Sequence, residues 1–312
     1  MKVLGISFGT KNGRNDCLCK EALMGAQEAG AEIEFIHAFD LDIHHCTGCN
    51  GCVQGQILGM GVRCAQKDEF EWMLDKMLDA DAVFFSTPVF EEGACGLFHT
   101  MMDRFGPRTD RGNVLDSKKM AEEKGTKMPD LRYLKEKAVS YIAIGGSQWN
   151  RRVDADFRIH AMSPMWKIVD AEAFPWGAVI VMDEKRRARI RQMGYDLAIA
   201  AKDLDHIEYK GDEGLCPMCH SRNFMFDADG KVVCEVCGIE GSMKCENGKY
   251  TFEFPEEQRE YSHVTLSGKA HHMADINAGL ANAMKTMQSP EYKERVKMYK
   301  EFISPTLPER KS

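Results

Sequence analysis

Residues 2–16 read KVLGISFGTKNGRND and combine a short apolar run with a loop of small polar residues. The run 2–8 is long enough for one buried strand, and a helical pattern follows over 15–29. A loop of this kind at the start of a helix can hold a phosphate with backbone N–H groups, hydroxyls and the positive end of the helix dipole. Other loops of this composition only turn the chain. Residues 2–16 therefore predict an α/β fold with a candidate phosphate site after its first strand.

The same alternation of strand and helix continues along the chain. Apolar segments predict further strands at 31–38, 82–88, 138–144 and 173–182, and helical patterns lie at 68–79, 96–105, 155–169 and 184–204. Strands that alternate with helices are typical of a parallel sheet covered by helices. A polar stretch at 107–129 exceeds the usual loop length, which favours either a functional lid or a disordered insertion.

Composition and charge limit the class of protein. The chain has 312 residues, of which 44% are hydrophobic and 29% are charged, as is ordinary for a soluble globular protein. Its net charge of -7 argues against a general nucleic-acid binder. No apolar run approaches the ~20 residues needed to cross a bilayer, and the N-terminus lacks the long apolar core of a signal peptide. We therefore expect a cytoplasmic protein without membrane or nucleic-acid partners.

Two later strand ends also carry polar loops with glycines, STPVFEEGACGLFHTMMDRFG at 86–106 and AIGGSQWN at 143–150. In a doubly wound sheet of order 2-1-3-4-5 the first, third and fourth strands are neighbours, so their loops meet in one crevice. These segments resemble the NADPH-dependent FMN reductase superfamily, whose fold is flavodoxin-like. The resemblance implies a five-stranded parallel sheet in that order, with FMN bound in the crevice.

The resemblance also assigns individual residues to the FMN. The sequence departs from the family pattern by about one extra residue in the first loop, by Asp16 in place of the usual Thr and by Phe90 in place of a common Tyr. The residues implied around the phosphate and ribityl chain are Ser7, Thr10, Asn12, Gly13, Asn15 and Asp16. Those implied along the isoalloxazine ring are Thr87, Pro88, Val89, Phe90, Glu91 and Gly93 on one side and Gly145, Gly146 and Ser147 on another.

A first group of cysteines follows the second predicted strand. Cys46, Cys49 and Cys52 have C-x2-C-x2-C spacing, and Cys64 comes after eleven more residues. Two-residue gaps let thiolates converge on a [4Fe–4S] cluster, whereas zinc usually takes pairs of cysteines. We expect a [4Fe–4S] cluster, with zinc or a metal-free thiol loop as alternatives. The group, followed by Lys67-Asp68-Glu69, resembles the iron–sulfur flavoproteins of the same superfamily, whose last gap is usually shorter.

A second group of cysteines has two C-x2-C pairs separated by fourteen residues. Cys216 and Cys219 form the first pair, and Cys234 and Cys237 the second. The intervening segment DADGK predicts a hairpin turn between two strand pieces. This spacing is typical of a zinc ribbon with a tetrahedral site of four thiolates. A rubredoxin-like iron centre would use the same four ligands.

These patterns predict four parts of the chain. Residues 1–204 form the flavodoxin-like FMN domain with the iron–sulfur loop at 44–66, 205–214 form a linker, 215–254 a zinc-ribbon-like module and 255–312 a helical tail. The predicted function is an FMN- and [4Fe–4S]-dependent oxidoreductase that passes electrons from ferredoxin or NAD(P)H to a small acceptor, aromatic or quinone-like in character. The alternative is an electron carrier or redox sensor that docks a protein partner through the ribbon.

Two further expectations complete the sequence-based interpretation. Trp149, Arg151, Arg152 and His160 follow the fourth strand and are candidates to bind an anionic or aromatic substrate, although arginines in such places are often solvated or ion-paired. The family resemblance also implies a homo-oligomer, since related proteins build flavin sites at subunit interfaces.

Overall fold

A parallel five-stranded sheet forms the centre of the N-terminal part. The computed structural model describes residues 1–61, 64–212 and 214–308, so that 62–63 of the cysteine loop, 213 of the linker and 309–312 of the tail lie outside it. The strand order is β2-β1-β3-β5-β6, which is the predicted order 2-1-3-4-5, and a short β4 pairs antiparallel to β3. The strands are β1 (Lys2–Ser7), β2 (Glu32–His37), β3 (Ala82–Phe90), β4 (Gly93–Ala94), β5 (Ala138–Ile144) and β6 (Lys167–Phe174).

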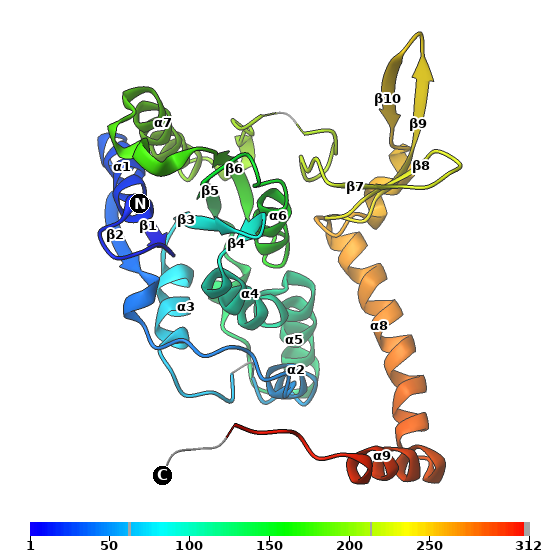
Figure 1. Ribbon diagram of the computed structural model, residues 1–312. Helices are drawn as coiled ribbons and strands as arrows, with labels where there is room; N and C mark the ends of the chain where they lie inside the picture. Colours follow the sequence, from blue (N-terminus) through cyan, green and yellow to red (C-terminus); the bar gives the residue numbers. More distant parts are fainter. Residues whose placement is uncertain (62–63, 213, 309–312) are drawn as a thin grey trace.

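Helices cover both faces of this sheet (Figure 1). Helices α1 (Arg14–Glu28) and α7 (Glu184–Ala200) pack on one face, and α3 (Phe70–Asp79), α4 (Gly96–Thr109) and α6 (Val153–Met162) on the other. The remaining helices of this part are α2 (Gly51–Ile57) and α5 (Arg111–Lys124), with 3-10 turns η1 (Ala38–Asp40), η2 (Leu131–Leu134), η3 (Gly177–Met182) and η4 (Leu204–His206). The fold is therefore the predicted flavodoxin-like α/β class.

The central strand β3 shows why the sheet needs cover on both faces. Val83 and Phe85 pack into the core under α3, α4 and α6, while Ala82 and Phe84 pack under α1 and α7. Successive side chains of a strand point to opposite faces, so a strand that is apolar at every position is buried on both. The run AVFF is therefore compatible only with an interior strand.

Helices α1 and α7 cross at unusually close range through two glycines. A Cβ on Gly25 would lie 1.9 Å from the carbonyl oxygen of Arg191, and one on Gly194 would lie 1.8 Å from that of Ala22. Each glycine thus lets the backbone of the other helix approach into contact. Leu18, Leu23 and Ile190 lie buried beside this crossing.

The predicted fifth strand at 173–182 is wrong. The edge strand β6 runs over Lys167–Phe174, and most of the apolar run that follows forms the turn η3. Pro175 has no N–H for a ladder, and Trp176 has a φ of 57°, which directs the chain out of the sheet. The predicted helix at 155–169 consequently ends earlier, at Met162. Charged residues in β6 conceal its strand pattern. One of them, Asp170, can be buried in the sheet because it binds Arg189.

The expectation of a lid or a disordered insertion at 107–129 is also wrong. Helix α4 continues to Thr109 and α5 occupies most of the remaining stretch, so the segment is mainly helical. Asp110 caps α5, accepting a hydrogen bond from the backbone N of Asn113 at 3.1 Å, and Gly125 ends α5 with a φ of 65°. None of the described residues of 107–129 lines the cavity at the carboxyl ends of the strands.

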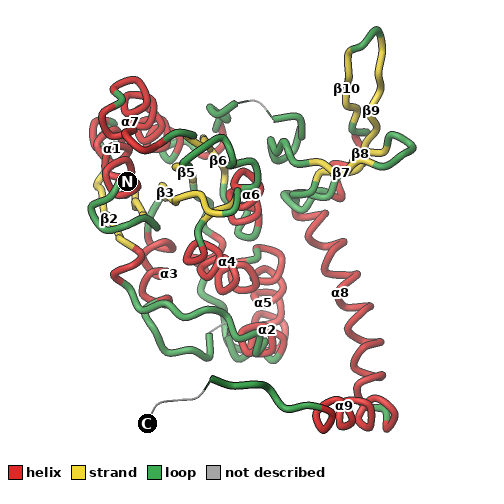
Figure 2. The backbone as a smooth tube through the Cα atoms, in the orientation of Figure 1, coloured by secondary structure: helices red, strands yellow, loops and turns green. Residues whose placement is uncertain are grey.

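The C-terminal part holds a second sheet and two helices. Strands β7 (Phe224–Phe226), β8 (Lys231–Cys234), β9 (Glu240–Glu246) and β10 (Lys249–Glu253) form an antiparallel sheet, in which β7 and β8 make the predicted hairpin. After η5 (Glu256–Tyr261), helix α8 (Leu266–Met287) leaves this sheet and α9 (Pro290–Phe302) lies at its far end (Figures 1 and 2). In the part of the chain that is described, no helix is long and apolar enough to span a membrane.

The glycine crossing gives a test of the packing of α1 on α7. Overpacking a core usually costs about 1–3 kcal/mol. We expect Gly194→Ala to destabilise the protein by about 3 kcal/mol or more, because the two helix backbones must separate. Gly279→Ala on α8 is the matched control, since its Cβ would meet no atom within 4 Å, and we expect a gain of about 0.5–1 kcal/mol. Denaturant unfolding measures both, and an unchanged midpoint for Gly194→Ala would contradict the close crossing.

Candidate functional site

A cavity of about 1010 Å³ opens at the carboxyl ends of β1, β2, β3 and β5. This is the edge at which ligands bind in doubly wound sheets. Eight of the residues proposed from sequence line it, namely Thr10, Gly13, Asn15, Pro88, Val89, Phe90, Gly145 and Gly146. The remaining lining residues are Phe8, Gly9, Lys11, Arg14, His37, Phe39, Asp40, Ile144, Gly177 and Ala178. The three loops expected to meet therefore do so.

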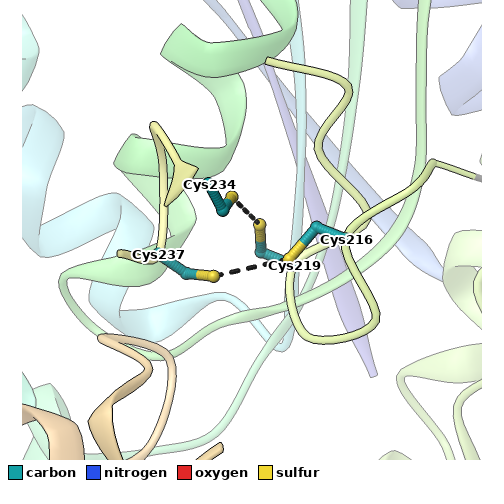
Figure 3. A group of neighbouring side chains, drawn as sticks. All are labelled: Cys216, Cys219, Cys234 and Cys237. Carbon is teal, nitrogen blue, oxygen red and sulfur yellow. Dashed lines mark hydrogen bonds between the residues drawn. The ribbon is translucent and has the colours of Figure 1, made fainter. Parts of the chain in front are cut away.

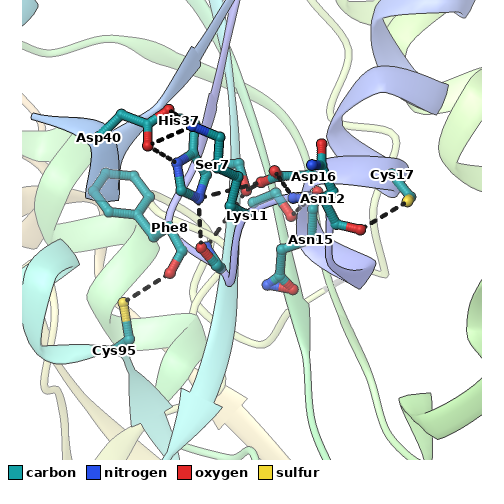
Figure 4. A network of polar contacts seen from close by, with 12 residues as sticks. Ser7, Phe8, Lys11, Asn12, Asn15, Asp16, Cys17, His37, Asp40 and Cys95 are labelled. Carbon is teal, nitrogen blue, oxygen red and sulfur yellow. Dashed lines mark hydrogen bonds and ion pairs between the residues drawn. The ribbon is translucent and has the colours of Figure 1, made fainter.

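The other residues proposed for this site lie outside the cavity lining. Ser7 and Asp16 are buried beneath the first loop, where the Ser7 hydroxyl donates to Asp16 Oδ1 at 2.5 Å. Asp16 Oδ2 accepts from the backbone N of Asn12 at 2.7 Å, as Figure 4 shows. Ser7 and Asp16 therefore support the loop from beneath. The seven proposed residues that lie outside the lining are Ser7, Asn12, Asp16, Thr87, Glu91, Gly93 and Ser147.

The end of β2 adds residues that the sequence interpretation missed. His37 Nε2 lies 2.9 Å from the carbonyl oxygen of Gly9, and Asp40 binds Lys11 Nζ at 2.9 and 2.8 Å (Figure 4). Strand β2 is the neighbour of β1, so its carboxyl end must lie beside the first loop. The predicted strand order could therefore have indicated these residues, because it places 37–40 at the same edge of the sheet as the first loop.

The first loop fits a phosphate group. Gly13 is the N-cap of α1 and provides no side-chain cap, so the start of the helix is open to an anion. The amide nitrogen Nδ2 of Asn15 is buried and has no hydrogen-bond partner among the described residues. Arg14 adds positive charge to the lining, and Lys11 lies there in its ion pair with Asp40. An anion here would satisfy the unpaired donor and the helix dipole together.

The other end of the cavity suits a flat ring. A Cβ on Gly177 would lie 2.3 Å from Ile144 Cγ2, whereas one on Gly146 would meet no atom within 4 Å. The backbone N of Gly177 donates to the carbonyl of Gly145 at 2.9 Å and so holds η3 against this loop. Phe90, at the end of β3, also lines this part of the cavity and is 64% exposed. An aromatic ligand can therefore stack on the Phe90 ring at this end.

The turn that carries Phe90 is strained and braced from α6. Glu91 and Glu92 have φ values of 48° and 67°, the left-handed pair of a type I′ hairpin turn that non-glycine residues rarely adopt. The carbonyl of Glu92 accepts from the backbone N of Val153 at 3.0 Å, and Asp156 Oδ2 accepts from the backbone N of Ala94 at 2.8 Å. Helix α6 therefore fixes the wall of the cavity from outside.

The candidate substrate-binding residues after β5 lie in different environments, and none of them lines the cavity. Trp149, Arg151 and Arg152 are exposed and lie outside the cavity lining. His160 is buried among aromatic rings, and its Nδ1 lies 2.8 Å from the Tyr141 hydroxyl. Burial lowers the pKa of His160 to about 3, so this imidazole is neutral. His160 is thus a core residue and does not contact the cavity.

The first cysteine group lies on a loop that is closed at its base. The backbone N of His44 donates to Asp68 Oδ2 at 2.8 Å, and that of Asp42 to Glu69 Oε2 at 2.6 Å. Gln66 Nε2 donates to the carbonyl of His45 at 2.6 Å. Lys67-Asp68-Glu69, noted in the sequence for its family pattern, therefore supplies two of the groups that join the ends of the loop.

The thiols of this group are open to a ligand. Cys46 and Cys49 are exposed and Cys52 and Cys64 are half-buried. Over residues 1–61, 64–212 and 214–308, these four do not form the tight convergence that one metal ion needs. The thiolates of a four-iron cluster each bind a different iron and so stand further apart than those around a single ion. In the described parts of the chain these four cysteines are therefore not a preformed single-ion site.

The second cysteine group is a preformed site for one ion. The sulfurs of Cys216, Cys219, Cys234 and Cys237 all lie within 4.8 Å of one another, and all four residues are buried (Figure 3). Cys216 Sγ lies 3.5 Å from Cys237 Sγ, and Cys219 Sγ lies 3.5 Å from Cys234 Sγ. Four converging thiolates are a tetrahedral donor set for zinc or iron. A four-cysteine metal site is therefore present at the position predicted from sequence.

Arg158, which the sequence interpretation did not single out, joins this metal site to α6. Its Nη1 donates to the carbonyl of Cys219 at 2.9 Å, and its Nη2 donates to the hydroxyl of Tyr209 at 3.0 Å. Asp154 binds the other side of the guanidinium at 2.7–2.9 Å. Burial works against the charge of Arg158, but the Asp154 carboxylate outweighs it and raises the pKa above its ordinary value.

Comparison with known proteins now identifies the family. The sequence profile described as NADPH-dependent FMN reductase matches residues 1–177, which is more than half of the chain. The chain belongs to the NADPH-dependent FMN reductase family. It is accordingly a flavin-dependent oxidoreductase, and FMN is the cofactor that this family indicates.

Individual known proteins resemble different lengths of the chain. A solved structure titled flavone reductase is 50% identical, covers 99% of this chain and 100% of its own, and superposes with a TM-score of 0.89. Flavone synthase cfoJ of Aspergillus candidus is 25% identical over 299 residues, 90% of each protein. An iron–sulfur flavoprotein of Archaeoglobus fulgidus is 34% identical over 105 residues, 33% of this chain and 48% of that protein.

The brace behind the cavity gives a pH-dependent test. His99 Nε2 lies 3.5 Å from Asp156 Oδ2, and the hydrogen bond to this carboxylate raises the pKa of His99 above its ordinary value. Such a group stabilises the fold fully below its unfolded pKa of about 6.5, and the contribution is lost as pH rises through the folded pKa. We expect thermal stability to fall across this window in the parent protein and to fall less in His99→Gln. Identical pH profiles would contradict the pairing.

The second cysteine group gives a test of metal dependence. We expect Cys219→Ser to lose the bound metal and to unfold the ribbon, because so small a sheet lacks a core of its own and the metal supplies its folding energy. Cys245→Ser is the matched control, since Cys245 is exposed on β9 and outside the cluster. Metal counted per chain and tryptic digestion of 214–264 report the outcome. Retention of metal by Cys219→Ser would exclude the four-thiolate site.

Proposed function

We propose that the chain uses FMN and NAD(P)H to reduce a carbon–carbon double bond conjugated to the carbonyl of a flat aromatic acceptor of the flavone class. The observation that carries this proposal is the 50% identity to a flavone reductase over 99% of the chain, including the ribbon and the tail. A second relative, matched over 90% of its length, is named a flavone synthase. Both names refer to a flavone, and we therefore propose a flavone as the substrate class.

FMN would lie along the cavity from one end to the other, with the acceptor at its opening. Asn15, Lys11 and Arg14 would hold the FMN phosphate at the start of α1. The backbone around Gly145 and Gly146 would lie along the isoalloxazine ring. When bound, FMN accepts hydride from a nicotinamide and delivers it from N5.

The residues at the opening would select the acceptor. Phe90 would present an exposed ring to it, and Trp176, which is 61% exposed, precedes the glycine that closes the ring end. Aromatic faces attract a flat conjugated ligand by stacking, which contributes about 0.5–1.5 kcal/mol for each pair of rings beyond area burial. The residues of the lining that could pair with a strongly anionic acceptor, Lys11 and Arg14, lie at the phosphate end.

We further propose a [4Fe–4S] cluster at Cys46, Cys49, Cys52 and Cys64, and zinc at the second cysteine group. The cluster would let a one-electron donor such as ferredoxin reduce the flavin, as an alternative to NAD(P)H. Similarity to iron–sulfur flavoproteins, at 34% identity over 105 and 108 residues, supports the cluster. The complete burial of the second group supports a structural ion, because a buried centre is poorly placed to exchange electrons with a partner.

A homo-oligomer is also proposed. Helices α8 and α9 expose an apolar series that a single chain leaves uncovered, with Met284, Met287, Tyr299 and Phe302 exposed at 53%, 52%, 60% and 81%. Exposed apolar surface of this extent is typical of subunit contacts. Light scattering at several protein concentrations measures the mass directly.

The proposed activity has a direct assay. Under anaerobic conditions, the full chain loaded with FMN should oxidise one NAD(P)H for each flavone reduced, with uptake of one proton, and chromatography should show the flavanone. Phe90→Ala should raise the KM for flavone about tenfold, because stacking on an exposed ring is lost, and should leave FMN bound. Trp72→Ala, at an exposed residue on α3, is the control. NAD(P)H oxidation with simple quinones and none with flavone would reject the substrate class.

A further inference from the structure

Two buried arginines lie one turn apart on α4, beside the first cysteine group. Arg104 and Arg108 are each 2% exposed, and their guanidinium carbons lie 4.3 and 5.7 Å from the centre of the Phe70 ring. Neither lines the cavity of the proposed flavin site. A buried charge is costly unless it is paired, so the partners of these groups indicate what they are for.

Carboxylates hold the terminal nitrogens of both side chains. Arg104 binds Asp68 through both terminal nitrogens, at 2.9 Å for Nη2, and Nη1 also donates to the carbonyl of His44 at 3.0 Å. Arg108 binds the two oxygens of Glu71 at 2.6 and 2.7 Å. These forked pairs fix the plane of each guanidinium. Asp68 is the residue that also closes the base of the cysteine loop.

One nitrogen of each arginine lacks a partner. The Nε atoms of Arg104 and Arg108 are buried, and neither has a hydrogen-bond partner in the described parts of the chain. A guanidinium has five N–H donors, and a buried one that is unpaired costs about 1–3 kcal/mol. The two Nε donors, on adjacent turns of one helix, are therefore available to an acceptor that the described residues do not supply.

The cysteines are the groups that these donors can serve. Arg104 donates to the carbonyl of His44, two residues before Cys46, and binds Asp68, four residues after Cys64. Cys52 is the second residue of α2, and α2 packs on α4. The first cysteine group thus lies beside the helix that carries this pair of arginines.

We infer that Arg104 and Arg108 are positioning residues for a bound iron–sulfur cluster, with Arg104 Nε–H donating a hydrogen bond to a cluster sulfur and Arg108 supplying positive charge beside it. This inference rests on the proposed cluster. Hydrogen bonds to the sulfurs and nearby positive charge stabilise the extra electron of the reduced cluster and raise its reduction potential. Asp68 and Glu71 hold the donors in place, so little reorganisation accompanies electron transfer.

The test measures the potential of the cluster rather than enzyme turnover. The full chain is reconstituted anaerobically with iron and sulfide, and its cluster is titrated with dithionite while its electron paramagnetic resonance is recorded. Arg104→Lys keeps the charge and loses the fork and the Nε donor. We expect it to retain iron and sulfide and to become about tenfold harder to reduce, a shift of ~59 mV for one electron. Arg132→Lys, at an exposed arginine held by three carboxylates, should change nothing.

A measurement on the unmutated chain covers the case in which Arg104→Lys fails to fold or to hold iron. The protein is labelled with nitrogen-15 at arginine Nε, and pulsed resonance of the reduced cluster should show a nitrogen-15 coupling. Absence of that coupling, or an unchanged potential in Arg104→Lys, would overturn the role of Arg104 while leaving the cluster in place. An unmutated chain that binds no iron and sulfide would instead reject the proposed cluster and this inference with it.

Discussion

The buried carboxylate of Asp16 sets the geometry on which the cavity depends. It accepts from the hydroxyl of Ser7 at the end of β1 and from the backbone N of Asn12 at the tip of the first loop. Asn12 has a φ of 54°, a conformation that the loop adopts only when it is held. One side chain in the first turn of α1 therefore ties the strand, the loop and the helix together. The open N-terminus of α1 and the unpaired amide of Asn15 face the cavity as a result.

Helix α6 holds two other parts of the structure from different sides. Asp156 braces the hairpin next to Phe90, and Arg158, half a turn further on, binds the carbonyl of Cys219 in the ribbon. Ala155 and Met162 pack against the apolar cluster that surrounds the four thiols. The ribbon and the wall of the cavity are thus held by one rigid helix. A metal site that stabilises the ribbon thereby also limits how far α6 can move.

Sequence reasoning was reliable where local pattern and tertiary structure agree. Continuous apolar runs such as AVFF and AVSYIAI can be buried only as interior strands, and paired C-x2-C motifs converge whatever surrounds them. It failed where tertiary contacts override composition. The charged β6 is a strand because Arg189 compensates Asp170, and 173–182 leaves the sheet because of Pro175 and the left-handed Trp176. His37 was missed because a lone histidine has no local signal, although the predicted strand order places it beside the first loop.

The closed base of the cysteine loop fixes where the loop leaves and rejoins the body of the protein. Residues 42–45 and 66–69 are fixed to each other by hydrogen bonds from both sides. The loop is also anchored between these ends, because α2 packs on α4 and α5 and the carbonyl of Gly59 accepts from the backbone N of Lys127 at 3.0 Å. Lengthening a loop adds little entropic cost, about 0.6 kcal/mol for each doubling. Changes of loop length during evolution are accordingly tolerated between these anchors without disturbing the sheet, whereas changes at the anchors alter the packing on α4 and α5.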